Sequence, residues 1–233
     1  MNIYQNPAPQ QWSELCRRAE QDNSLIAERV AAIAERVAMQ GDKALYELAE
    51  QIDGVKLASL AVSEQEFADA EQRVSEDVKA AIEVAVANIE AFHRAQLPTE
   101  VRVETQPGVV CVQRPVAIGK VGLYIPGGTA PLFSTVLRLA LPAKIAGCKE
   151  IVLCTPTDKQ GCVAAEVLYA ARRCGVTKVF KAGGAQAVAA MAYGTESVPK
   201  VYKIFGPGNR YVTLAKQLVA GRNTSIEIGR AHV

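Results

Sequence analysis

Three glycine-containing segments carry the side chains with the clearest potential for ligand chemistry. They are Pro-Gly-Gly-Thr-Ala-Pro at 126–131, Gly-Gly-Ala-Gln at 183–186 and Gly-Pro-Gly-Asn at 206–209. Each segment follows a short apolar run and precedes a stretch of helical periodicity. Glycine allows a ligand to approach the backbone, and the N-terminus of a helix attracts phosphate. Together the segments predict a nucleotide-shaped site, although a tight turn is the simpler explanation for any one of them alone.

Three polar side chains belong to these segments or lie next to them. Tyr124 ends an apolar run, and a buried tyrosine hydroxyl needs a hydrogen-bond partner. Gln186 and Asn209 fall in the first turn of predicted helices, where asparagine is also a good N-cap. We expect the three side chains to bind the ribose, phosphate or amide of a cofactor. None of the segments is a GxGxxG or Walker sequence, so neither motif identifies the nucleotide.

The usual catalytic groups are missing from these segments. The chain has two histidines, His93 and His232, and neither lies near them in sequence. Ser134 follows the first segment without a histidine partner, which excludes a Ser-His-Asp arrangement. We expect Cys148 to be a packed thiol and His93 to be a structural or solvent-facing residue. The sequence therefore predicts cofactor-binding residues and no catalytic residue.

The cysteines do not form a recognisable metal or disulfide pattern. The chain contains six of them, at positions 16, 111, 148, 154, 162 and 174, and no two form a CxxC pair. With only two histidines besides, no zinc site is expected from this inventory, so the predicted metal-binding residues are none. We expect reduced thiols that serve as small, buried, apolar residues.

Composition restricts the class of protein. The chain has 233 residues, 49% of them hydrophobic, with a net charge of +2, which is typical of a globular domain. The near-neutral charge gives no reason to expect nucleic acid as a partner. No apolar run approaches the roughly 18 residues of a membrane span, and the first residues do not resemble a signal peptide. We therefore expect a soluble, cytoplasmic protein that binds no membrane.

The first hundred residues have helical periodicity. Apolar residues recur at helical spacing from Leu25 to Val37, Gly41 is a stop signal, and Asp42 can cap the next helix. Ser63 to Glu66 form a capping box. A longer predicted helix begins at Ser75 and is ended by Pro98. Such helices could form a partner-binding bundle, but a packing layer over a core is the preferred interpretation.

Two changes of pattern follow. Residues 101–105 alternate between apolar and polar, Pro107-Gly108 is a turn signal and the apolar run 109–112 follows, which together predict a β-hairpin. From 115 to 227, short apolar runs at 121–125, 151–154, 176–180, 201–205 and 224–228 alternate with helical segments. This alternation predicts an α/β fold with a Rossmann-like, doubly wound parallel sheet, in which the three glycine segments share the carboxyl edge.

The last six residues, Ile-Gly-Arg-Ala-His-Val at 228–233, do not continue this pattern. The codons ATC GGA AGA GCA CAC GTC would encode them, and that string matches a common sequencing-library adapter. We expect this tail to be adapter-derived and non-native, with the natural protein continuing in its place.

Longer sequence strings around the glycine segments are far more specific indicators of a protein family than the glycines themselves. They are Arg114-Pro-Val116, the run from Val121 to Thr135, Pro142-Ala-Lys-Ile-Ala-Gly-Cys148, Gly183-Gly-Ala-Gln-Ala187 and Lys203-Ile-Phe-Gly-Pro-Gly-Asn209. These strings closely resemble histidinol dehydrogenase, and the resemblance extends from about residue 20 to residue 227.

The resemblance implies the last steps of histidine biosynthesis. Such enzymes oxidise L-histidinol to L-histidine through an aldehyde, with two NAD⁺ reduced in turn. They are zinc-dependent homodimers built from two Rossmann-like domains and smaller ones. By the resemblance, Tyr124, Gln186 and Asn209 match positions that contact NAD, in agreement with the reading of the glycine segments.

The resemblance also implies that this chain is a fragment of its parent enzyme. The family's zinc ligands, its catalytic Glu-His pair and most histidinol contacts lie beyond residue 228. We therefore expect residues 1–114 to belong to an incomplete domain of helices and a hairpin, 115–227 to form the NAD-binding domain, and the fragment alone to be inactive. The alternative is a non-catalytic, Rossmann-like nucleotide-binding module.

Overall fold

A five-stranded parallel sheet forms the centre of the computed structural model, which describes residues 4–16, 23–128, 130–221 and 224–226. The strands lie in the order β5-β4-β3-β6-β7, so β3 is central and the order reverses between β3 and β6. Their bounds are β3 Lys120–Tyr124, β4 Glu150–Thr155, β5 Lys178–Lys181, β6 Lys203–Phe205 and β7 Ser225–Ile226. This order confirms the predicted doubly wound α/β fold.

The strands alternate their side chains between two separate hydrophobic clusters. On β4, Val152 and Cys154 belong to one cluster, whereas Ile151 and Leu153 belong to the other. All four side chains are buried, because helices cover both faces of the sheet. This is why the strands read as continuous apolar runs and not as an apolar and polar alternation.

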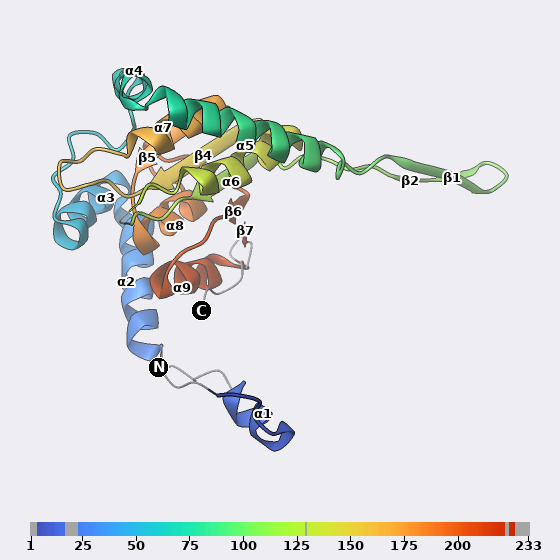
Figure 1. Ribbon diagram of the computed structural model, residues 1–233, viewed down its shortest axis with the longest axis horizontal. Helices are drawn as coiled ribbons and strands as arrows, with labels where there is room; N and C mark the ends of the chain where they lie inside the picture. Colours follow the sequence, from blue (N-terminus) through green and yellow to red (C-terminus); the bar gives the residue numbers. More distant parts are fainter. Residues whose placement is uncertain (1–3, 17–22, 129, 222–223, 227–233) are drawn as a thin grey trace.

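Four helices that connect the strands cover the two faces (Figure 1). On one face lie α6 Phe133–Ile145 and α7 Ala165–Arg173, which contact each other. On the other lie α8 Gly184–Tyr193 and α9 Arg210–Val219. Each begins shortly after a strand ends, so three of the four helix N-termini follow the glycine segments of the sequence.

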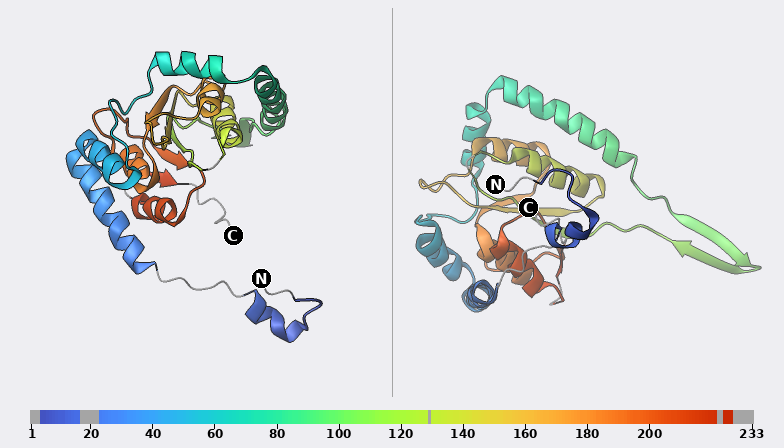
Figure 2. Two further views of the ribbon diagram at one scale, coloured as in Figure 1. Left: turned by 60° about the vertical axis from the view of Figure 1, so that its left-hand side comes forward. Right: turned by 60° about the horizontal axis from the view of Figure 1, so that its bottom comes forward.

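The N-terminal helices form an outer layer on each side of the sheet (Figure 2). Helix α2 Ser24–Gln40 packs against α8, α9 and α3 Asp42–Leu48. Helix α4 Glu64–Arg73 packs against α7, and α5 Glu76–Arg94 packs against α6. The interpretation of these helices as packing layers is thus confirmed. Because they share both clusters with the sheet, the expected division at residue 114 stays a prediction.

The predicted hairpin is present and extends away from the sheet (Figure 1). It consists of β1 Val101–Gln106 and β2 Val109–Gln113, paired antiparallel, and Gly108 adopts a φ of 81° in the turn. Every residue of both strands is exposed. The first helix, α1 Pro9–Leu15, also buries no residue.

The structure confirms one predicted cap and contradicts another. Ser63 caps α4 as expected, and Ser75, where a helix was expected to begin, is the N-cap of α5; each side chain accepts a backbone N–H. Asp42 is not an N-cap, because it is already the first residue of α3. Its carboxylate instead accepts hydrogen bonds from the hydroxyls of Thr195 and Ser197, both at 2.5 Å. The predicted cap is thus a link between α3 and the loop after α8.

Other expectations differ in detail. Helix α5 ends at Arg94, before Pro98, and a five-residue π-helical turn, η1 Ala49–Asp53, follows α3. All six cysteines are free, but Cys16, Cys111 and Cys162 are exposed, so the prediction of uniformly buried thiols is wrong. The expected adapter-derived tail lies outside the described residues. Within the described ranges, no helix is long and apolar enough to cross a membrane.

Candidate functional site

The three glycine segments meet around Tyr124, at the carboxyl ends of β3, β5 and β6. The Tyr124 hydroxyl accepts a hydrogen bond from the backbone N–H of Gly184, at 3.0 Å. Gly206, with a φ of 129°, packs on the Tyr124 backbone so closely that a Cβ there would lie 2.1 Å from the Tyr124 carbonyl oxygen. One residue at the end of β3 therefore joins the second and third segments, at the edge where such sheets bind ligands.

Two of the glycines are required by packing between loops. A Cβ on Gly127 would lie 2.7 Å from Pro156, and a Cβ on Gly183 would lie 2.8 Å from the same ring. Pro156 follows β4 and is thus inserted between the first and second segments. Gly128 differs, because its nearest neighbour would be the Ala130 carbonyl oxygen at 3.9 Å. Of these three glycines, Gly128 is the one with space for a ligand.

Gln186 lies in the first turn of α8 and is 4% exposed. Its Nε2 donates to Oδ2 of Asp53 at 3.4 Å, a long hydrogen bond. Its Oε1 faces Gly184, where a Cβ would lie only 3.0 Å away, and Gly184 has a φ of 57°. Gly184 therefore gives its N–H to Tyr124 and leaves room for the amide of Gln186.

Asn209 is the N-cap of α9. Its Oδ1 accepts the backbone N–H of Val212 at 3.2 Å, and its side chain is exposed. The capping role that the residue type favours is thus present. Within the described part of the chain, the Asn209 amide nitrogen makes no hydrogen bond, so the cap leaves a donor at the rim of the site.

The electrostatics of the site centre on Asp53, the last residue of the π-helical turn. Burial raises the pKa of its carboxyl, while the charge of Lys159 and the hydrogen bond from Gln186 lower it. Burial also raises the pKa of Tyr124, the Gly184 N–H opposes this, and the charge of Asp53 raises it further. At neutral pH the Tyr124 hydroxyl is therefore protonated and can still donate its hydrogen.

A buried cation supports the third segment. Lys216 of α9 is 6% exposed, and its Nζ donates to the carbonyl of Gly206 at 2.9 Å. This hydrogen bond satisfies a buried backbone acceptor and fixes the loop that packs on Tyr124.

A cavity of about 200 Å³ opens beside the first segment. Its walls come from residues 126–128 and 130–132, from the segment 155–158 after β4, and from Cys162, Ala164 and Val167. The open side of Gly128 faces this region, so the cavity extends the site along the carboxyl edge of β3 and β4.

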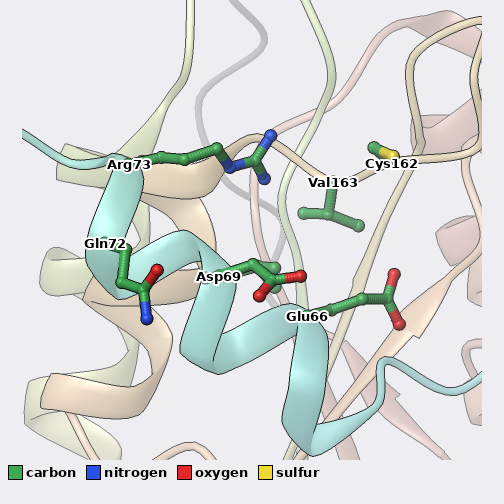
Figure 3. Close-up of a pocket in the computed structure, with 7 residues that line it drawn as sticks. Glu66, Asp69, Gln72, Arg73, Cys162 and Val163 are labelled. Atoms are coloured by element: carbon green, nitrogen blue, oxygen red, sulfur yellow. The ribbon is translucent and has the colours of Figure 1, made fainter.

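A second cavity, of about 410 Å³, lies beneath α4, and its walls include four polar side chains of that helix, Glu66, Asp69, Gln72 and Arg73 (Figure 3). Asp69 and Arg73 extend from α4 toward the Cys162–Val163 segment. Glu66 is already engaged, because it accepts the Lys181 ammonium at 2.6 Å and caps α4 with Ser63. A third cavity, of about 610 Å³, is mainly apolar and includes His93 in its wall. Neither cavity is lined by Tyr124, Gln186 or Asn209.

The described residues do not fit a zinc site. Among them, no three His, Cys, Asp or Glu side chains come together. His93 packs edge-on against the exposed ring of its neighbour Phe92, with ring centroids 5.5 Å apart. Burial raises the pKa of the Cys148 thiol and raises that of Cys154 to about 12, so neither is an activated nucleophile.

The three glycine segments lie at one edge of the sheet, as the sequence predicts, but sequence reasoning missed three residues that contact them or Gln186. Asp53 is separated from Gln186 by 133 positions and lies at a helix end, where Gly54 signals only a turn. Pro156 has no motif that distinguishes it. Lys216 could have been found, since it falls within the buried stripe formed by Val212, Ala215 and Val219.

Comparisons with known proteins agree on one family. The family model described as histidinol dehydrogenase matches residues 16–230. Histidinol dehydrogenase from Bacteroides thetaiotaomicron is 54% identical over 228 residues, 98% of this chain and 53% of that protein. The Mannheimia succiniciproducens enzyme is 60% identical over 195 residues, 84% of this chain and 45% of that protein.

Solved structures give the same result. The crystal structure of histidinol dehydrogenase from Elizabethkingia anophelis matches with a TM-score of 0.93 at 41% sequence identity. The match covers 98% of this chain and 53% of that one. The chain thus spans about half the length of the relatives it matches.

Proposed function

Because the chain belongs to the histidinol dehydrogenase family, we propose that it forms the NAD-binding part of an enzyme that oxidises L-histidinol to L-histidine. The observation that carries this proposal is the meeting of the three glycine segments around Tyr124, at the point where the strand order reverses. Ligands of doubly wound sheets bind at such a point. The proposed setting is the cytoplasm, with a homodimer as the assembly of the whole enzyme.

The polar groups at this edge match the needs of a dinucleotide. The Tyr124 hydroxyl has its hydrogen free to donate, Gln186 offers an amide, and Asn209 offers an amide nitrogen at the start of α9. The open side of Gly128 leaves space for backbone approach. We propose that these three side chains hold NAD and fix its orientation.

Bound NAD⁺ would supply the hydride acceptor. Each of two successive oxidations transfers one hydride and releases one proton, and the second also takes an oxygen atom from water. The residues of this chain would bind the cofactor and exclude water at the carboxyl edge of the sheet. Among the described residues no three His, Cys, Asp or Glu side chains come together as zinc ligands, and we assign no proton-transfer or metal step to this chain.

NAD⁺ titration by calorimetry tests the proposal. We expect the chain to bind NAD⁺, and Gln186→Ala to weaken binding about tenfold, the worth of one hydrogen bond to a charged or buried group. Tyr124→Phe should weaken it by a similar or smaller factor.

The controls are a tyrosine and a glutamine of the surface. Tyr202→Phe changes a tyrosine that is 57% exposed, and Gln65→Ala changes an exposed glutamine of α4. Both should bind NAD⁺ like the wild type. Unchanged affinity in both Gln186→Ala and Tyr124→Phe would contradict the proposed site.

A further inference from the structure

Asp53 lies beside the proposed cofactor site, although it belongs to the N-terminal helical region, which the sequence predicts to be a packing layer. The π-helical turn Ala49–Asp53 follows α3, and Gly54 ends it in the left-handed region, with a φ of 69°. π-helical turns occur frequently at functional sites. The carboxyl of Asp53 is half-buried and accepts a hydrogen bond from Gln186. The two residues are 133 positions apart in the sequence.

The contact determines which way the amide of Gln186 points. An amide can turn by half a rotation and exchange its oxygen for its nitrogen at little cost. An ionised carboxylate only accepts hydrogen bonds, so it selects the orientation in which Nε2 faces Asp53. The Gln186 Oε1 then faces Gly184, the residue whose backbone N–H donates to the Tyr124 hydroxyl.

Asp53 is itself held in place. Lys159, on the loop after β4, donates from Nζ to the backbone carbonyl of Asp53 at 3.2 Å. The charge of Lys159 acts on the Asp53 carboxyl, and the charge of Asp53 acts on Tyr124. The three elements around the carboxyl, η1, β3 and α8, thus bring it close to both polar side chains of the site.

We propose that Asp53 is a positioning residue that fixes the amide of Gln186, so that the cofactor meets an acceptor, Oε1, next to a donor, the Tyr124 hydroxyl. This inference rests on the proposed function. A donor and an acceptor together suit a ligand group that both accepts and donates hydrogen bonds. In NAD such a group is a ribose hydroxyl or the carboxamide. Asp53 need not touch the cofactor to act in this way.

A double-mutant cycle tests the inference. We expect Asp53→Ala to weaken NAD⁺ binding by about fivefold to tenfold, since the freed amide no longer has a fixed orientation. The variant with both Asp53→Ala and Gln186→Ala should bind no more weakly than Gln186→Ala alone, because Asp53 acts through Gln186. Asp53→Asn offers an amide that donates as well as accepts, so it no longer selects one orientation of Gln186 and should also weaken NAD⁺ binding, by no more than Asp53→Ala does.

The matched control is a second Asp-Gln pair away from the site. Gln65 Nε2 donates to Asp69 Oδ1 at 2.7 Å on α4, and Asp69→Ala should leave NAD⁺ affinity unchanged. A titration with ADP-ribose, which lacks the carboxamide, separates the two ligand groups. An equal loss in Asp53→Ala with ADP-ribose indicates a ribose hydroxyl, and a loss confined to NAD⁺ indicates the carboxamide.

The outcomes separate this inference from the function on which it rests. No NAD⁺ binding by the wild-type chain would overturn both. Weakened binding in Gln186→Ala with wild-type affinity in Asp53→Ala would overturn the role of Asp53 alone. Additive losses in the double variant would do the same, because they would show that the two residues act independently. Circular dichroism of each variant checks that it is folded, and Asp53→Asn carries the test if Asp53→Ala is not.

Discussion

At the scale of single residues, burial disfavours the charged forms of two side chains in the site, Asp53 and Tyr124. Asp53 loses hydration on folding, and its partners offset only part of that cost, so its pKa is raised. A protein keeps such a carboxyl where its charge or its acceptor oxygens are needed. Tyr124 is the complementary case, since burial and the nearby carboxylate both keep its hydroxyl protonated.

The raised pKa of Asp53 predicts how stability depends on pH. The stability that Asp53 contributes is greatest below its ordinary pKa of 3.8 and is lost as the pH rises through the raised value. Asp53→Asn removes this titration while keeping an acceptor. We therefore expect Asp53→Asn to match the wild type near pH 4 and to be slightly more stable at pH 7, by less than about 1 kcal/mol because the group is half-exposed.

Urea unfolding between pH 4 and pH 8 measures this difference. A gap that widens with pH supports the burial of an ionised carboxylate at position 53. A constant gap, or one that widens toward low pH, would contradict it.

At the scale of elements, the loops after β3, β4 and β5 are held together by one proline ring. Gly127 and Gly183 approach Pro156 from two sides, and neither has a positive φ, so their lack of a side chain matters only for packing. A Cβ on Gly128, the next residue, would be near only the Ala130 carbonyl oxygen, at 3.9 Å. Adjacent glycines of one loop thus differ in packing: Gly127 is required by the fold, and for Gly128 we propose contact with the cofactor.

This difference predicts opposite effects for two neighbouring substitutions. Gly127→Ala places a methyl group 2.7 Å from Pro156 and should destabilise the protein by about 1–3 kcal/mol, as overpacking does. Gly128→Ala has its nearest neighbour at 3.9 Å and should leave stability almost unchanged, but should weaken NAD⁺ binding. Thermal unfolding and NAD⁺ titration of the two variants check both effects, and equal stability losses would show that the loops are not packed as described.

At the scale of the whole molecule, the layers and the hairpin differ sharply in how they are stabilised. The sheet lies between two layers of helices on each side, and buried side chains such as Ile82 connect α5 to the sheet cluster. The hairpin has exposed valines along both strands, and a two-stranded hairpin alone is marginally stable in water. The fold of the layers therefore should not depend on the hairpin.

Replacing residues 101–113 by a short Gly-Ser linker tests this independence. Glu100 and Arg114 already form an ion pair at 2.8 Å, so a few residues can close the gap. We expect the melting temperature to change by less than about 2 °C, whereas Ile82→Ala, at a fully buried position, should cost about 2–5 kcal/mol. Loss of cooperative melting in the linker variant would show that the hairpin supports the core.

The sequence by itself determined the order of elements, the parallel sheet and the meeting of the three glycine segments. Those features follow from local signals: apolar periodicity, glycine and proline at turns, and serine at helix starts. The long strings around the glycines also identified the family. Tyr124 and Gln186 could be singled out because each stands beside such a signal.

Only the tertiary structure decided what those residues contact. The pairing of Asp53 with Gln186, the insertion of Pro156 between two glycines and the link from Asp42 to Thr195 and Ser197 join positions far apart in the chain. No local pattern encodes them, because a carboxylate at a helix end is equally suited to capping, to solvent or to a distant partner. The packing of α2 on α8 and of α3 on α2, and with it the position of η1 after α3, selects the partner.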